Sequence, residues 1–178
     1  MFKEIEKAIE RIYVSKDKNF FISCCKKKID FLDELLIILK DKYLKFILFN
    51  DFPDDPCIEI HFDVDYFISD NFNIKYTSVL KINKIVDFFY LQHEFSIENP
   101  DPNGMGVLDG FGDEAYNKLQ FNLDNIICHY LNSKHYKRLG YANMEEVIPE
   151  LKMPDNNIFG TQMTVDNALF NDLWGIAL

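Results

Sequence analysis

Hydrophobic positions change their spacing twice along the chain, and the changes divide it into three predicted parts. In residues 1–50, apolar side chains recur every three or four positions, which is the spacing of amphipathic helices. The pattern predicts one helix near residues 2–13 and a second from about Phe20 to Leu48. The stretch NDFPDDP, with two prolines and three acidic residues, then ends the helical part.

A period of two begins at Cys57 and predicts a sheet. In the stretch CIEIHFDVDYF, apolar and polar residues alternate, which places four ionisable side chains on one face of a strand: Glu59, His61, Asp63 and Asp65. FNIKYTS and VDFFYLQHEFSIE alternate in the same way, and a further short strand is predicted near residues 79–82. The sequence therefore predicts an antiparallel meander of three to four strands over residues 57–98.

Glycine, proline and acidic residues dominate ENPDPNGMGVLDGFGDE, which predicts an acidic, Gly-rich loop over residues 99–114. Residues 115–178 are predicted to be helical, with a helix around 123–131, Gly140 as its C-cap, and a capping-box pattern at Asn143 in NMEEVIPEL. Apolar residues predict that the tail docks on the core: Val165, Leu169, Phe170, Leu173 and Trp174. This order indicates a single α+β domain whose C-terminal helices pack on one face of the sheet.

Composition narrows the class of protein. A chain of 178 residues with 48% hydrophobic content is long enough for one domain with a substantial core. The N-terminal stretch MFKEIEKAIERIY lacks the apolar run of a signal peptide, and no stretch reaches the roughly 18 apolar residues of a membrane span. These features predict a cytoplasmic protein without a membrane partner. The spacing of the cysteines fits neither a zinc site nor a disulfide framework, so reduced, structural thiols are expected: Cys24, Cys25, Cys57 and Cys128.

Acidic residues are concentrated in two blocks of the predicted sheet region. The net charge is −10, and residues 51–178 alone carry −13. No basic residue lies between Lys45 and Lys75 or from Ile85 to Asn117, and each block contains seven acidic residues. Like charges on neighbouring strands cost stability, and neither block contains a cation that would offset the cost. A basic protein would offset it, whereas the same field repels nucleic acid.

The acidic blocks, together with the aromatic residues beside them, predict a surface that binds a basic protein. Aromatic side chains supply contact area at interfaces, and complementary charge accelerates association. The predicted contact residues are Glu59, Asp63, Asp65, Tyr66, Asp87, Tyr90, Glu94, Glu98, Asp109, Phe111, Asp113 and Glu114.

Three other interpretations of the alternating strand remain open, and the first is that it forms a plain solvated face of the sheet. Glu59, His61, Asp63 and Asp65 are residue types that bind divalent metals, as in a metal-dependent hydrolase or nuclease. Residues two apart on a strand lie about 6.6 Å apart at Cα, so about two of the four would reach one ion, and the sequence shows no second ligand cluster. The third interpretation is a structural subunit with no catalytic residues, metal or cofactor.

The remaining candidate groups favour structural roles. His93 and Glu94 are adjacent on a predicted strand and point to opposite faces, while His129 lies in a helical pattern with no Ser or Cys nucleophile in register. The glycines of DPNGMGVLDGFG match neither a phosphate-binding loop nor an EF-hand loop. CCKKK, at residues 24–28, is the only basic run and predicts a solvated helix face.

The stretch YLQHEFSIENPDPNGMGVLDGFGDEAYNKLQFNL combines a strand, an acidic Gly-rich loop and a helix. In this and in its size, acidity and aromatic strands, the chain resembles small immunity proteins of bacterial polymorphic-toxin and contact-dependent growth inhibition systems. The resemblance covers residues 57–140 and implies a non-enzymatic intracellular antidote. Such an antidote binds a cognate toxin domain, often a basic nuclease, and blocks its active site. These proteins share no universal motif, so the resemblance assigns no functional residue.

Overall fold

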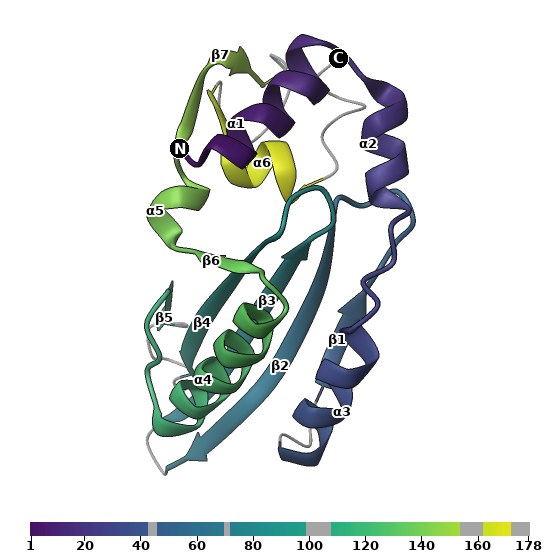
Figure 1. Cartoon of the computed structure of the whole chain (residues 1–178). Coiled ribbons are helices and arrows are strands. Elements are labelled where there is room, and N and C mark those ends of the chain that lie inside the picture. The colour runs from purple at the N-terminus through teal and green to yellow at the C-terminus, as the bar shows by residue number, and fades with distance from the viewer. Residues whose placement is uncertain (43–45, 70–71, 99–107, 154–161, 172–178) are drawn as a thin grey trace.

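A twisted sheet runs through the molecule, with two helices on one face and a second group of elements at one end (Figure 1). The computed structural model describes residues 1–42, 46–69, 72–98, 108–153 and 162–171. Helices precede and follow a mainly antiparallel sheet, which confirms the predicted α+β class.

The sheet contains more strands than the alternating pattern predicts. Five strands pair antiparallel in their chain order, and a short sixth strand pairs in parallel with the fourth. Their bounds are β1 Phe46–Asn50, β2 Cys57–Ile68, β3 Asn73–Asn83, β4 Phe88–Glu98, β5 Leu108–Gly112 and β6 Lys137–Leu139. The predicted meander corresponds to β2, β3 and β4, and the strand predicted near residues 79–82 is the end of β3.

The bounds of one predicted helix and one predicted loop are wrong, because each contains a short strand. The helix predicted from Phe20 to Leu48 is instead split into α2 (Lys18–Cys25) and α3 (Leu32–Lys42), and FILFN forms β1. The predicted loop over residues 99–114 contains β5, while residues 99–107 lie outside the described part of the chain. A run of five residues is too short for its periodicity to distinguish strand from helix or loop.

Two helices, α3 and α4 (Lys118–Ser133), cover one face of the sheet, which we call the helix face. Their apolar sides pack on the central strands in a layer with no solvent exposure: Leu35, Leu39, Ile58, Ile60, Leu80, Ile82, Leu91, Leu123 and Ile127. Burying one such side chain contributes about 1.5–3 kcal/mol. The Asn117 side chain begins α4 by accepting a hydrogen bond from the backbone N–H of Gln120 at 2.8 Å.

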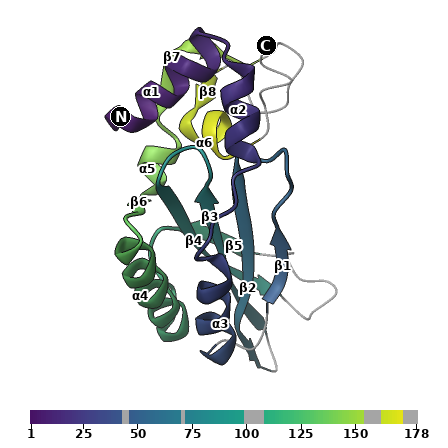
Figure 2. The same cartoon turned by 45° about the vertical axis from the view of Figure 1, so that its right-hand side comes forward.

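The first and last segments of the chain meet at one end of the sheet (Figures 1 and 2). This end group consists of α1 Lys3–Ile9, the π-helical turn η1 Glu10–Val14, α2, α5 Tyr141–Met144, β7 Val147–Lys152, β8 Gln162–Thr164 and α6 Val165–Leu169. The Tyr13 hydroxyl donates to the Ala168 carbonyl at 2.9 Å and joins the two ends of the chain. The C-terminal helices therefore do not share one face: α4 lies on the helix face, and α5 and α6 belong to the end group.

Three details of the C-terminal prediction are settled by the structure. The predicted C-cap, Gly140, is instead the N-cap of α5, because α4 ends at Ser133 and β6 follows. No helix begins at Asn143 in NMEEVIPEL, because its first two residues end α5 and its second half forms β7. The tail docks on the core as predicted, with buried Val165, Leu169 and Phe170. Leu173 and Trp174 lie outside the described residues.

A β-bulge changes which side chains of β2 share a face. Asp63 pairs with Thr77 and Asp65 pairs with Tyr76, so β2 contains one extra residue, Val64, at this point. Because strand side chains alternate, the extra residue reverses the alternation beyond it. Asp65 therefore lies on the side of the helix face. Tyr66 lies beside Asp63 on the opposite face, in the position predicted for Asp65.

The thiols and the helices give two further findings. All four cysteines are free, and burial raises the pKa of Cys57 to about 12 and that of Cys128 to about 11. Within the described part of the chain, every helix is too short or too polar to cross a membrane.

Candidate partner-binding face

The sheet side opposite α3 and α4 is the candidate site, and we call it the open face. The strand register assigns its side chains, which come from four neighbouring strands. They are Glu59, His61, Asp63 and Tyr66 on β2, Lys75, Thr77, Val79 and Lys81 on β3, Gln92, Glu94, Ser96 and Glu98 on β4, and Asp109 and Phe111 on β5. The described helices pack on the other side of these strands or at the end of the sheet.

Seven of the twelve predicted contact residues lie on this face: Glu59, Asp63, Tyr66, Glu94, Glu98, Asp109 and Phe111. Tyr90 points to the same side but is only 4% exposed, because the end group covers it. Asp87 lies in the connection between β3 and β4, and Asp113 and Glu114 follow β5. Asp65 lies beyond the bulge, where its carboxylate accepts a hydrogen bond from Asn117 at 3.3 Å.

On the β2–β3 half of the open face, the charges are balanced. Lys75 pairs with Asp63 at 3.1 Å, and Glu59 contacts the His61 imidazole. Lys81 pairs at 3.1 Å with Asp166, which α6 contributes. Burial alone would lower the pKa of the Lys81 ammonium, but the Asp166 carboxylate outweighs burial and raises it. The first acidic block contains no Lys or Arg of its own, as the sequence shows, but Lys75 from outside the block pairs with its Asp63.

The β4–β5 half carries carboxylates that no cation neutralises. Thr77 donates to Glu94 at 2.9 Å and Gln92 donates to it at 2.6 Å, so both carboxylate oxygens bind neutral donors. Among the described residues, Glu94, Glu98 and Asp109 form no ion pair. Negative charge on the open face is therefore concentrated along β4 and β5.

Tyr90, which the end group covers, is the first donor in a row of hydrogen bonds that leads through Gln92 to Glu94. Its hydroxyl donates to the Gln92 side chain at 3.2 Å. Burial, followed by the nearby Asp113 and Asp166 carboxylates, raises the Tyr90 pKa well above its usual value. The hydroxyl holds the Gln92 carbonyl oxygen, which orients the Gln92 amide nitrogen toward Glu94.

Two exposed aromatic rings stand beside these carboxylates. Phe111 is 57% exposed and lies directly across from Glu94 in the strand register. The Tyr141 ring packs edge-on against it, with centroids 5.7 Å apart. Tyr141 is held in place by its backbone N–H, which donates to the Asp113 carboxylate at 2.6 Å. No local sequence pattern indicates Tyr141, because only the tertiary structure brings α5 to β5.

The predicted metal-binding set does not assemble. The bulge removes Asp65 from the face that holds Glu59, His61 and Asp63, and Lys75 already neutralises Asp63. In the described part of the chain, no three His, Cys, Asp or Glu side chains are placed to hold a metal ion together.

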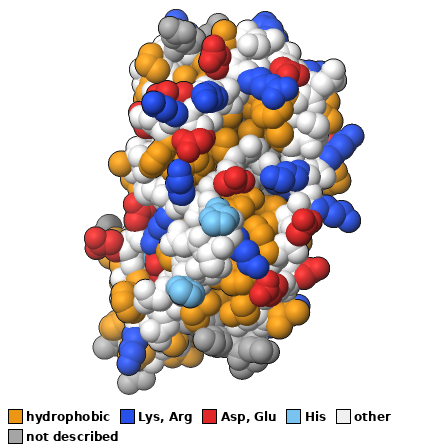
Figure 3. Space-filling model, viewed as in Figure 1, with side chains coloured by type: hydrophobic (Ala, Val, Ile, Leu, Met, Phe, Trp, Pro, Cys, Tyr) orange, Lys and Arg blue, Asp and Glu red, His pale blue; other side chains and the backbone are white. Residues whose placement is uncertain are grey.

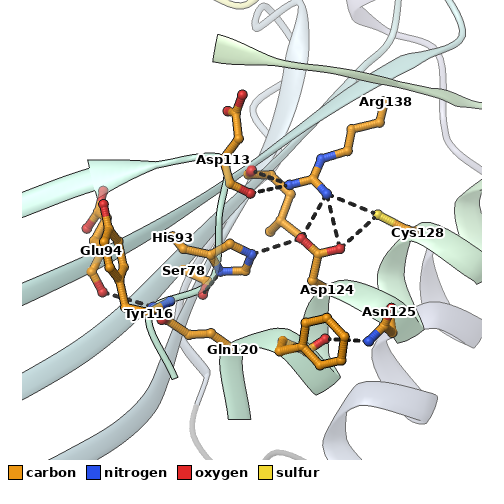
Figure 4. Close-up of polar contacts among 12 residues, drawn as sticks. Ser78, His93, Glu94, Asp113, Tyr116, Gln120, Asp124, Asn125, Cys128 and Arg138 are labelled. Carbon is orange, nitrogen blue, oxygen red and sulfur yellow. Dashed lines mark hydrogen bonds and ion pairs between the residues drawn. The ribbon is translucent and has the colours of Figure 1, made fainter. Parts of the chain in front are cut away.

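A second polar cluster lies beneath α4 and was not predicted (Figure 4). Ser78 Oγ and His93 Nδ1 are 2.8 Å apart, and His93 Nε2 lies 3.0 Å from Asp124 Oδ2. Arg138 pairs with the same carboxylate at 2.8 Å and donates to the backbone carbonyl of Asp113 at 2.9 Å. The cluster joins β3, β4, α4 and β6, and its sequence signal is a set of polar residues at positions that face the apolar core.

The Ser, His and Asp of this cluster resemble a nucleophilic triad only in residue type. Ser78 and His93 are 0% exposed, so a substrate has no access to the hydroxyl. The structure confirms the predicted structural role of His93, which is buried with both ring nitrogens in hydrogen-bonding contact.

The cluster predicts a specific loss of stability in acid. Burial would raise the Asp124 pKa, but the His93 hydrogen bond and the Arg138 charge outweigh burial and lower it. A lowered folded-state pKa contributes stability above the unfolded-state value, and this contribution is lost as pH falls through the folded-state pKa. Asp124→Asn is therefore expected to reduce the dependence of unfolding free energy on pH below about 4. Urea unfolding of both proteins from pH 7 to pH 3 measures this, and equal pH dependence contradicts it.

The opposite side of the molecule has a different charge pattern. On the side where α4 lies in front of the sheet, basic and acidic side chains are interspersed (Figure 3).

Comparison with known proteins adds no candidate function, because no protein-family model, curated protein or solved structure matches the chain.

Proposed function

We propose that the protein is a non-catalytic immunity protein that binds and neutralises a basic toxin domain through the open face. The observation that carries the proposal is the β4–β5 half of this face, where unpaired carboxylates surround an exposed aromatic pair. Complementary charge accelerates capture of a basic partner, and aromatic side chains supply buried contact area. Fast capture suits an antidote, which must bind its toxin before damage occurs.

The position of these groups on a supported sheet favours tight binding. Most of the contact residues are on strands whose other side packs against α3 and α4. Side chains on such rigid elements lose less conformational freedom on association than side chains on a mobile loop. The open face is therefore suited to binding a preformed surface without rearrangement.

The charge of the face also selects the partner class. Phosphate backbones are repelled by a surface with unpaired carboxylates, so the protein is proposed to act on the toxin and not on nucleic acid. A toxin that is itself a nuclease carries the basic surface needed to hold its substrate. By covering that surface, the open face would compete with the toxin's substrate.

Co-expression with the toxin domain encoded beside the chain tests this function. Cells that express the active toxin are expected to survive with the chain and to die without it, and the two proteins are expected to co-purify. A non-cognate basic toxin domain controls for specificity, and an inactivated cognate toxin controls for expression. Death in the presence of well-expressed chain, or the absence of a complex, would refute the proposal.

A further inference from the structure

The two halves of the open face differ in net charge and in whether their carboxylates form ion pairs. Glu59, Asp63, Lys75 and Lys81 give the β2–β3 half a net charge of zero. Glu94, Glu98 and Asp109 give the β4–β5 half −3, and its strands contribute no Lys or Arg to the face. An intramolecular ion pair must be broken before an outside cation can replace it, whereas a carboxylate that has only neutral donors keeps an uncompensated charge. A basic partner is therefore expected to place its cations over β4 and β5.

Phe111 lies on β5, the outer strand of this half. Glu94 is its cross-strand neighbour, at a side-chain spacing of about 5 Å, and Asp109 is two residues away on the same face of β5. Tyr141 packs against the ring in an edge contact, and the Phe111 side chain is still 57% exposed to solvent. The arrangement is an exposed aromatic ring flanked by two carboxylates.

We propose that this arrangement binds an arginine side chain of the partner, with the guanidinium stacked on Phe111 and paired with Glu94 and Asp109. The inference rests on the proposed function, and it adds the chemical identity of the partner's anchor. Arginine fits better than lysine because the guanidinium is planar, stacks on aromatic rings and bonds carboxylates through several N–H groups. The ammonium of lysine is a compact, strongly hydrated charge that gains less from the ring.

Labelled nona-arginine and nona-lysine peptides test the proposal without the toxin. Fluorescence anisotropy at low salt is expected to show about tenfold tighter binding of nona-arginine than of nona-lysine to the unaltered chain. Phe111→Leu keeps an apolar side chain but removes the ring, so the preference for nona-arginine is expected to fall to about twofold, the part that the carboxylates supply. Phe121→Leu is the matched control, because Phe121 is 59% exposed on α4, and it should retain the tenfold difference.

The carboxylates have a separate effect in the same assay. Glu94→Gln with Asp109→Asn is expected to weaken both peptides while leaving the circular dichroism spectrum unchanged. Equal binding of the two peptides to the unaltered chain would overturn the inference, and so would an arginine preference that Phe111→Leu leaves undiminished.

The peptide assay and the co-expression test examine separate claims, so either one can fail while the other succeeds. If the chain prefers nona-arginine through Phe111 but does not protect against the toxin, the immunity function is wrong and the arginine-binding site stands. If it protects but shows no arginine preference, the function stands and the anchor is wrong.

Discussion

Replacing His93 with leucine is expected to lower the free energy of unfolding by about 3 kcal/mol. Leucine occupies the space of the imidazole but leaves the buried Ser78 hydroxyl without its partner and removes one hydrogen bond to Asp124. An unsatisfied buried hydroxyl costs about 1–3 kcal/mol, and a lost hydrogen bond to a charged group adds a similar amount. For a domain of this size, the loss corresponds to a fall in melting temperature of about 9 °C.

His129→Leu is the matched control for this measurement. His129 lies on the same helix as Asp124 but is exposed, so the same substitution there should change the free energy of unfolding by less than about 0.5 kcal/mol. Urea unfolding of the three proteins gives both values. Equal stability of His93→Leu and the unaltered chain would show that the buried cluster does not stabilise the fold.

The strands that the sequence predicted well are those with long alternating patterns. β3 and β4 each extend over eleven residues, so a period of two is evident in them. FILFN and LDGFG have only five residues, and they become strands because β2 and β4 offer them free edges to pair with. Such long-range pairing leaves no local signal, and this is why the predicted sheet was too small.

The sequence predicted which strands contribute to the candidate face, but not every residue that lies on it. Alternation in CIEIHFDVDYF correctly grouped Glu59, His61 and Asp63, yet the bulge at Val64 exchanged Asp65 for Tyr66. A bulge depends on the register between two strands and is not visible in one of them. The ion pairs of Asp63 and Lys81 were hidden for the same reason, since each joins residues distant in sequence.

Charge reversal on β4 and β5 is expected to produce the largest change in partner binding. Glu98→Lys with Asp109→Lys converts the unpaired acidic half into a basic one, and repulsion of a basic toxin should weaken binding by about 100-fold. Both side chains are exposed and outside the hydrogen-bonded row through Glu94, so the fold should tolerate the change. The association rate should fall and lose most of its salt dependence.

The dissociation constant of the cognate toxin domain at low salt is the most direct test of binding through this half of the open face. Two variants with the same change in net charge are compared: Glu98→Lys with Asp109→Lys, and Glu10→Lys with Asp65→Lys. Glu10 and Asp65 are also exposed but lie on the end group and beyond the bulge. We predict about 100-fold weaker binding for the first variant and less than about threefold for the second. Equal weakening of both would show that only net charge matters and would contradict a binding site on β4 and β5.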